Sequence, residues 1–81
     1  MSNLQNLGAI LKFHRKKAGL TQLELAKLAG VGKTVVFDLE KGKDTVQLDT
    51  LKKILRVLNI TVRLESPLMQ HYEREGARET S

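Results

Sequence analysis

The stretch that decides the fold is residues 21–42, which read TQLELAKLAGVGKTVVFDLEKG. Its apolar residues recur at the spacing of two short helices, and the Gly-Val-Gly run at positions 30–32 predicts a tight turn between them. The faces that the apolar pattern leaves outside carry cationic and amide side chains. The stretch therefore predicts a compact helical pair with one apolar side and one polar side.

The first helix of the pair has clear start and stop signals. Thr21 is placed to be its N-cap, and Glu24 three positions later completes a Thr-x-x-Glu capping box. Gly30 is placed to end the helix, because glycine readily adopts the left-handed conformation found after helix C-termini. The residues that we expect to face the core are Leu25, Ala26 and Ala29.

The second helix of the pair is expected from about residue 33 to residue 41, with Gly42 ending it. Val36 and Leu39 are three residues apart and should be buried. The side chains then left on the outer face are Lys33, Thr34, Phe37, Asp38 and Lys41.

Two further helices flank this pair. The first ends at Gly19, and it has an apolar face of Leu4, Leu7, Ile10, Leu11 and Ala18 opposite a basic face of Lys12, Arg15, Lys16 and Lys17. The second is expected at about residues 47–58, with an apolar face of Leu48, Leu51, Ile54, Leu55 and Leu58 opposite Lys52, Lys53 and Arg56. The sequence therefore predicts a mainly α-helical bundle of four to five short helices.

The period changes after residue 59. Residues 60–65, ITVRLE, alternate apolar and polar side chains, which is the signature of a strand whose apolar side holds Ile60, Val62 and Leu64. A lone strand cannot pair its own backbone groups, so we expect it to pair with the same strand of a second copy in a homodimer. Pro67 ends the strand. We thus divide the chain into a binding and dimerisation domain, 1–66, and a flexible tail, 67–81.

Composition narrows the classes of function. The 81 residues carry a net charge of +5, and the basic excess lies in residues 1–66, which favours a polyanionic partner, either nucleic acid or a membrane surface. The membrane is disfavoured, because the apolar faces of the basic helices are needed for the core. With no cysteine, two distant histidines and no catalytic constellation, we expect no metal site, no cofactor and no enzymatic activity. Without a secretion signal or bilayer-spanning run, the expected location is the cytoplasm.

These motifs resemble the lambda-repressor-like (Cro/CI, XRE) helix-turn-helix family over roughly residues 5–58. The resemblance is carried by the runs Leu20-Thr21-Gln22, Glu24-Leu25-Ala26, Ala29-Gly30-Val31 and Leu39-Glu40-Lys41-Gly42. It implies a helix-turn-helix that inserts its second helix into the major groove of double-stranded DNA. It also implies an operator that is an inverted repeat, bound by a homodimer.

A narrower resemblance is to HipB-like antitoxins, including their Y4mF-type relatives. It comes from the run DLEKGK at 38–43, TVQL at 45–48, the apolar residues that follow, and the strand placed directly after them. It implies a repressor of its own operon that also binds a HipA-type kinase toxin. The alternative is a stand-alone phage-type or metabolic repressor of the same family, with no toxin partner.

The resemblance and the helical pattern together select candidate DNA contacts. The expected base-reading residues are Lys33, Thr34, Phe37 and Asp38. The expected phosphate contacts are Gln22, Lys41, Lys43 and Lys17. These residues are candidates because each lies on the outer face of a predicted helix or near a helix end.

Alternatives stay open for three of the residues in and around this surface. Phe37 can pack against the groove between the two helices in place of touching DNA. Asp38 can accept a hydrogen bond from cytosine N4, or pair with Lys41 or Lys33 and touch no base. Glu40 is expected to brace the end of its helix through hydrogen bonds or an ion pair.

Overall fold

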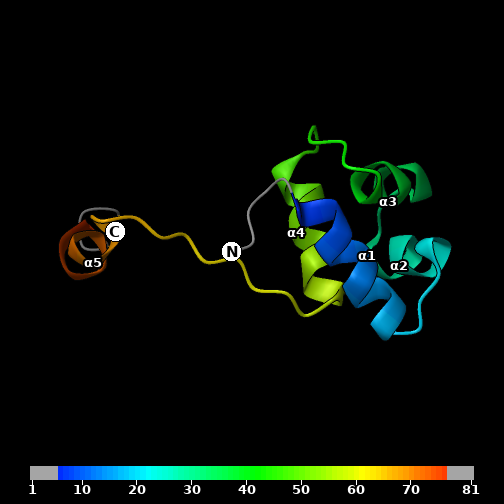
Figure 1. Ribbon diagram of the computed structural model, residues 1–81, viewed down its shortest axis with the longest axis horizontal. Helices are drawn as coiled ribbons and strands as arrows, with labels where there is room; N and C mark the ends of the chain where they lie inside the picture. The colour runs from blue at the N-terminus through cyan, green and yellow to red at the C-terminus, as the bar shows by residue number, and fades with distance from the viewer. Residues whose placement is uncertain (1–5, 77–81) are drawn as a thin grey trace.

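The computed structural model describes residues 6–76, and four helices of this range form one body (Figure 1). They are α1 (Leu7–Lys17), α2 (Gln22–Ala29), α3 (Lys33–Glu40) and α4 (Leu48–Val57). Helix α3 packs against both α1 and α2, and α2 also packs against α4. The predicted helices are confirmed, with ends that differ from the expected ones by a residue or two.

One apolar core joins all four helices. It is made by Leu11 from α1, Leu25, Ala26 and Ala29 from α2, Val36 and Leu39 from α3, and Ile54, Leu55 and Leu58 from α4 and its C-cap. Burying a leucine-sized side chain contributes roughly 1.5–3 kcal/mol, so these contacts supply most of the driving force. The α2 and α3 residues that the sequence predicts to face inward are all in this core.

The caps of α2 are those that the sequence predicts. The Glu24 backbone N–H donates to the Thr21 hydroxyl at 3.0 Å, and the Thr21 N–H donates to the Glu24 carboxylate at 2.8 Å. At the other end Gly30 has φ of 72°, and the next N–H, that of Val31, donates back to the carbonyl of Ala26 at 2.9 Å. These local bonds fix where α2 begins and ends, and therefore where α3 starts.

Gly8 brings α1 into close contact with α3. It is buried in the first turn of α1, and a Cβ built on it would overlap the carbonyl oxygen of Leu39 and lie 3.1 Å from that of Glu40. The backbone at the end of α3 therefore packs directly on the backbone of α1. Leu4, which the sequence places on the same face of this helix, lies outside the described residues.

Two residues expected on apolar helix faces are exposed. Leu48, at the first position of α4, is 70% exposed, and Ala18 is exposed at the C-cap of α1. Both lie at helix ends, where the pattern continues but the neighbouring helix no longer covers the face. Periodicity alone therefore overestimates the extent of the buried stripe.

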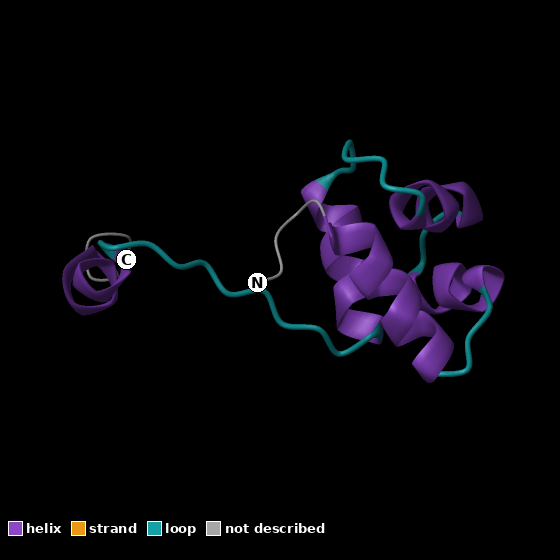
Figure 2. Cartoon of the chain, viewed as in Figure 1, coloured by secondary structure: helices purple, strands orange, loops and turns teal. Residues whose placement is uncertain are grey.

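The predicted strand is not formed in the single chain. After α4 the chain turns at Asn59, which has φ of 59°, and residues 60–66 then run without regular structure away from the bundle (Figure 2). No strand occurs anywhere in the range 6–76, because a strand needs a partner for its backbone groups and one chain supplies none. Ile60 packs against the core, whereas Val62 and Leu64 are exposed.

The tail is partly helical, which the sequence pattern does not predict. Helix α5 (Met69–His71) continues into a π-helical turn, η2 (Tyr72–Gly76), at a distance from the bundle (Figure 1). A carboxylate of Glu75 lies 3.9 Å from His71, one turn away. Leu68 and Tyr72 are exposed on this segment. The contacts within this segment are thus short-range in sequence; the flexible tail stays a prediction, and residues 77–81 lie outside the described range.

The packing at Gly8 predicts an unusual sign for one substitution. Replacing glycine by alanine inside a helix normally stabilises it by about 0.5–1 kcal/mol. For Gly8→Ala we instead expect destabilisation by about 1–3 kcal/mol, because the new methyl group overlaps backbone of α3 that has no rotamer to move. Chemical denaturation followed by circular dichroism measures the difference. A variant more stable than the wild type would contradict the close contact between α1 and α3.

Candidate nucleic-acid interface

The outer face of α3 presents the predicted base-reading side chains together. Lys33, Thr34 and Phe37 are exposed, and Asp38 is half-buried beside them. Lys33, Phe37 and Lys41 are spaced four residues apart, and Thr34 and Asp38 form a second row with the same spacing. The helix therefore carries two adjacent rows of polar and aromatic groups toward solvent.

A buried ion pair fixes the far end of this helix. The Arg15 Nε donates to one carboxylate oxygen of Glu40 at 2.6 Å, and its Nη2 donates to the other at 2.9 Å. The side chains of Arg15 and Glu40 are only 9% and 3% exposed. Arg15 Nη1 also donates to the carbonyl of Leu20 at 2.8 Å. The bidentate pair thus connects α1, the α1–α2 loop and the last residue of α3.

Gln22 joins the same network from the first position of α2. Its amide Nε2 donates to a carboxylate oxygen of Glu40 at 3.1 Å. An amide group carries two N–H bonds, so this contact leaves one donor of Gln22 for another acceptor. Gln22 therefore braces the last residue of α3, and its contact with phosphate stays a prediction.

The charges in this network are stabilised by their partners. Burial raises the pKa of the Glu40 carboxyl, but hydrogen bonds from Arg15 and Gln22 and the nearby positive charges outweigh it, so the net pKa lies below the ordinary range. The hydrogen bond to Glu40 raises the pKa of Arg15 more than burial lowers it. Both groups are therefore charged at neutral pH.

Sequence reasoning placed Arg15 wrongly. The helical pattern assigns it to the basic solvent face of the first helix with Lys12, Lys16 and Lys17, yet its side chain is only 9% exposed. Only the prediction that Glu40 braces the end of its helix, through hydrogen bonds or an ion pair, pointed to a partner for this carboxylate. The partner could be recognised only once α1 and α3 were placed side by side.

The N-terminus of α3 begins without a side-chain cap. Gly32 is the N-cap residue, and it makes no side-chain hydrogen bond because it has no side chain. The helix starts immediately at Lys33, so a cation occupies its first turn, where the backbone N–H groups lack intrahelical partners. The positive end of the helix dipole and the Lys33 side chain therefore occur at the same end of α3.

Phe37 lies on the outer face, where it stacks with a lysine. Its ring is 44% exposed, and the Lys41 ammonium lies 4.9 Å from the ring centroid. This geometry is a cation–π contact, which orients both side chains along the helix surface. The contact of Phe37 with DNA stays a prediction.

Asp38 has a partner that the sequence did not suggest. Its carboxylate lies 3.6 Å from the ammonium of Lys43, beyond the end of α3, and not beside Lys33 or Lys41. The pair is partly exposed, with side-chain exposures of 34% for Asp38 and 58% for Lys43. Lys43, expected as a phosphate contact, is therefore already engaged with a carboxylate.

Lys17 belongs to a different cluster. Its ammonium lies 5.6 Å from the ring centroid of Phe13, which itself meets the His14 ring edge-on. The Nδ1 atom of His14 lies 2.7 Å from the carbonyl oxygen of Ile10, so this histidine has a local structural role. Lys17 is exposed near the end of α1, and its contact with phosphate stays a prediction.

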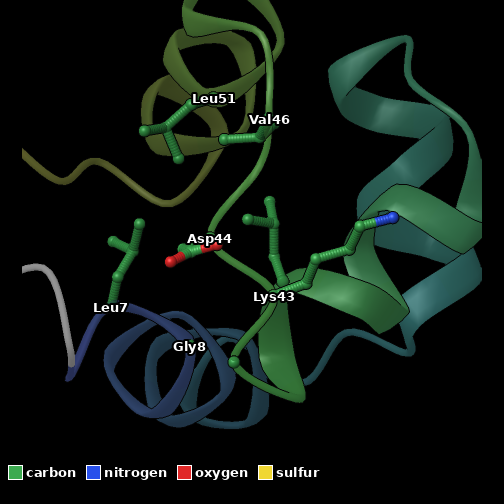
Figure 3. Close-up of a pocket in the computed structure, with 8 residues that line it drawn as sticks. Leu7, Gly8, Lys43, Asp44, Val46 and Leu51 are labelled. Atoms are coloured by element: carbon green, nitrogen blue, oxygen red, sulfur yellow. The ribbon is translucent and has the colours of Figure 1, made fainter.

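A hollow of about 490 Å³ lies between the start of α1 and the loop after α3 (Figure 3). Its walls are mainly apolar, and they include Leu7, Leu39, Val46 and Leu51. It lacks a group of acidic or histidine ligands, and none able to hold a metal ion occurs in residues 6–76. The chemistry of the polar outer face of α3, and not this hollow, therefore defines the candidate site.

Comparison with known proteins agrees with this geometry. Residues 11–64 match the family model described as Helix-turn-helix. The chain is 37% identical over 62 residues to the uncharacterized HTH-type transcriptional regulator y4mF of Sinorhizobium fredii, covering 76% of this chain and 82% of that protein. It is 34% identical over 58 residues to the antitoxin HipB of Escherichia coli, covering 72% of this chain and 62% of HipB.

A solved structure gives the same result for the fold. A chain of the HipA-HipB-O2-O3 complex superposes with a TM-score of 0.71 at 30% sequence identity, covering 83% of this chain and 94% of that one. The family model and this superposition therefore both agree with the helix-turn-helix arrangement of α2 and α3.

In the described part of the chain, no helix is long and apolar enough to span a membrane.

The lowered pKa of Glu40 predicts how stability changes with pH. The unfolded carboxyl has a pKa of about 4.3, and the folded one lies below it, so its contribution is complete above that value and is lost as pH falls through the folded pKa. Each unit between the two pKa values contributes about 1.4 kcal/mol. We expect the free energy of unfolding to fall below about pH 4.

The matched variant is Glu40→Gln, which keeps the shape and removes the titrating group. At neutral pH it should be destabilised by about 3 kcal/mol or more, because Arg15 is left buried without a countercharge. Its stability should then decline less between pH 5 and 3 than that of the wild type. Urea titrations across this pH range measure both, and equal declines would contradict the assignment to Glu40.

Proposed function

Because the chain belongs to the helix-turn-helix family of DNA-binding transcription regulators, we propose that it represses its own operon and is the antitoxin of a HipBA-like toxin–antitoxin pair. The DNA-binding part of this proposal rests on the exposed face of α3, which has Lys33 and Thr34 at its N-terminal end. The buried Arg15–Glu40 pair fixes the other end of the helix. A rigid helix with polar groups on its outer side is what major-groove reading requires.

The two ends of α3 have different roles in this proposal. Lys33 can donate to guanine O6 or N7, and the methyl and hydroxyl of Thr34 can meet thymine or a polar base edge. Lys41 and the free N–H of Gln22 bind phosphates, which positions the helix without reading sequence. Phe37 offers its exposed ring to a thymine methyl group, beside the ammonium of Lys41.

The protein acts as a homodimer in this proposal. Residues 60–66 leave the bundle in an open chain with two exposed apolar side chains, Val62 and Leu64. Pairing with the same segment of a second copy would satisfy the backbone and cover both side chains. Two copies of α3 would then lie about 34 Å apart, matching an inverted repeat with half-sites one helical turn apart.

The antitoxin role is supported by similarity to HipB, a protein solved together with HipA. The partner would be a HipA-type kinase, and both proteins would meet in the cytoplasm. The second candidate is a stand-alone repressor of the same family, without a toxin partner. Co-expression with the product of the adjacent gene, followed by copurification, separates the two. Absence of a kinase-like neighbour would support the stand-alone repressor.

DNase footprinting on the promoter of its own gene tests the DNA-binding role. We expect protection of two half-sites related by a twofold axis, with centres one helical turn apart. Repression follows if the protected region overlaps the polymerase site. Failure to protect any promoter sequence at low salt, where electrostatic attraction is strongest, would reject the DNA-binding role.

Three alanine variants separate base reading from phosphate binding. Lys33→Ala and Thr34→Ala should each cost about 1–3 kcal/mol on the preferred site and relax the preference at particular base pairs. Lys41→Ala should weaken binding to all sequences and reduce the salt slope by about one. Fluorescence anisotropy over a salt series measures these effects. An unchanged preference in Lys33→Ala would show that α3 is placed wrongly in the groove.

Proline at position 62 tests the dimer. Val62→Pro removes a ladder donor and should abolish pairing between two copies of residues 60–65, while the helical bundle, which does not contain Val62, keeps its fold. Sedimentation velocity should report a dimer for the wild type and a monomer for the variant. Circular dichroism serves as the folding control. A variant that stays dimeric would refute pairing through this segment.

A further inference from the structure

One acidic side chain lies among the exposed groups of α3. Asp38 is one turn beyond Thr34 on the same row, and the other charged residues of this face, Lys33 and Lys41, are cations. A carboxylate near phosphates is repelled, and it loses hydration when the helix enters the groove. Asp38 without compensation would therefore oppose DNA binding.

The end of α3 supplies that compensation through two contacts with Lys43. Gly42 has φ of 101°, which turns the chain so that the Lys43 backbone N–H donates to the carbonyl of Asp38 at 3.0 Å. The Lys43 ammonium then lies 3.6 Å from the Asp38 carboxylate. Figure 3 shows the Lys43 side chain running away from Leu7 and Asp44 and toward α3. The helix cap thus places this cation.

Resting on the DNA binding proposed above, we propose that Lys43 is a positioning residue that neutralises Asp38 and directs its carboxylate to a cytosine in each half-site. A carboxylate only accepts hydrogen bonds, so it needs a donor on the base edge. Guanine offers two acceptors in the major groove, and adenine places the N7 acceptor beside its N6 donor, whereas cytosine offers the N4 donor. Cytosine is the base that Asp38 can face with least repulsion.

This role differs from that of a phosphate contact in a measurable way. If Lys43 binds phosphate, its loss weakens binding whether or not residue 38 is charged, and the salt slope falls. If Lys43 acts through Asp38, its loss leaves a carboxylate unpaired at the interface, and removing that charge should restore binding. The double-mutant cycle therefore separates the two roles.

The experiment compares Lys43→Met, Asp38→Asn and the double variant, with Lys41→Met as the matched control. Lys41 is also an exposed lysine at the end of α3, but its ammonium contacts the Phe37 ring and not Asp38. Anisotropy with a labelled promoter duplex gives the dissociation constants. Selection from a random-sequence duplex library gives the base preferences, whatever the sequence of the operator.

We expect Lys43→Met to weaken binding by about tenfold, and the double variant to bind within about threefold of Asp38→Asn. Asp38→Asn should not restore Lys41→Met. The wild type should select cytosine at one symmetric position, and Asp38→Asn should shift that position toward adenine, because asparagine bonds to adenine N6 and N7 together.

Two results would overturn the inference while leaving the DNA-binding role intact. In the first, the wild type binds the promoter duplex, but adding Asp38→Asn to Lys43→Met does not restore the affinity. In the second, the wild type shows no cytosine preference, or that preference is unchanged by Asp38→Asn. A wild type that neither binds the promoter duplex at low salt nor enriches any sequence would instead reject the proposed function, and the role of Lys43 with it.

Discussion

The ion pair between Arg15 and Glu40 determines where α3, the second helix of the helix-turn-helix, lies. Both side chains are almost fully buried, and the guanidinium meets the carboxylate through two hydrogen bonds. Removing one partner of such a pair typically destabilises the fold by about 3–5 kcal/mol, because the other charge is left buried without a countercharge. In a domain this small that is a large part of the total stability. The orientation of α3 therefore depends on a contact with α1.

The same pair connects the core with the surface. Glu40 also accepts a hydrogen bond from Gln22, so the first residue of α2 and the last residue of α3 share one carboxylate. Gly8 brings the α1 backbone against the same end of α3. The outer side chains of α3 thus project from a helix that is fixed at its C-terminal end by three contacts. A site of this kind gains affinity from preorganisation, because little ordering is left to occur on binding.

The helix-turn-helix could be predicted from sequence because its signals are local. The capping box of Thr21 and Glu24 and the glycine stop at position 30 each involve residues a few positions apart, and the structure confirms them. The dimer strand was inferred from alternation in residues 60–65, but a ladder needs a second chain, so one chain cannot form it. The helical turn at residues 69–76 had no periodic signal long enough to predict it.

The sequence by itself determined the helices, most of the core and the face of α3 that points outward, since apolar spacing and caps act within a single segment. Tertiary structure alone decided the partners of the charged residues. Arg15 has the helical position of a surface cation, yet it is buried, because Glu40 lies opposite it once α1 packs on α3. Lys43 follows a glycine that turns it back onto Asp38. Charge pairing depends on distance in space, which spacing along the chain does not encode.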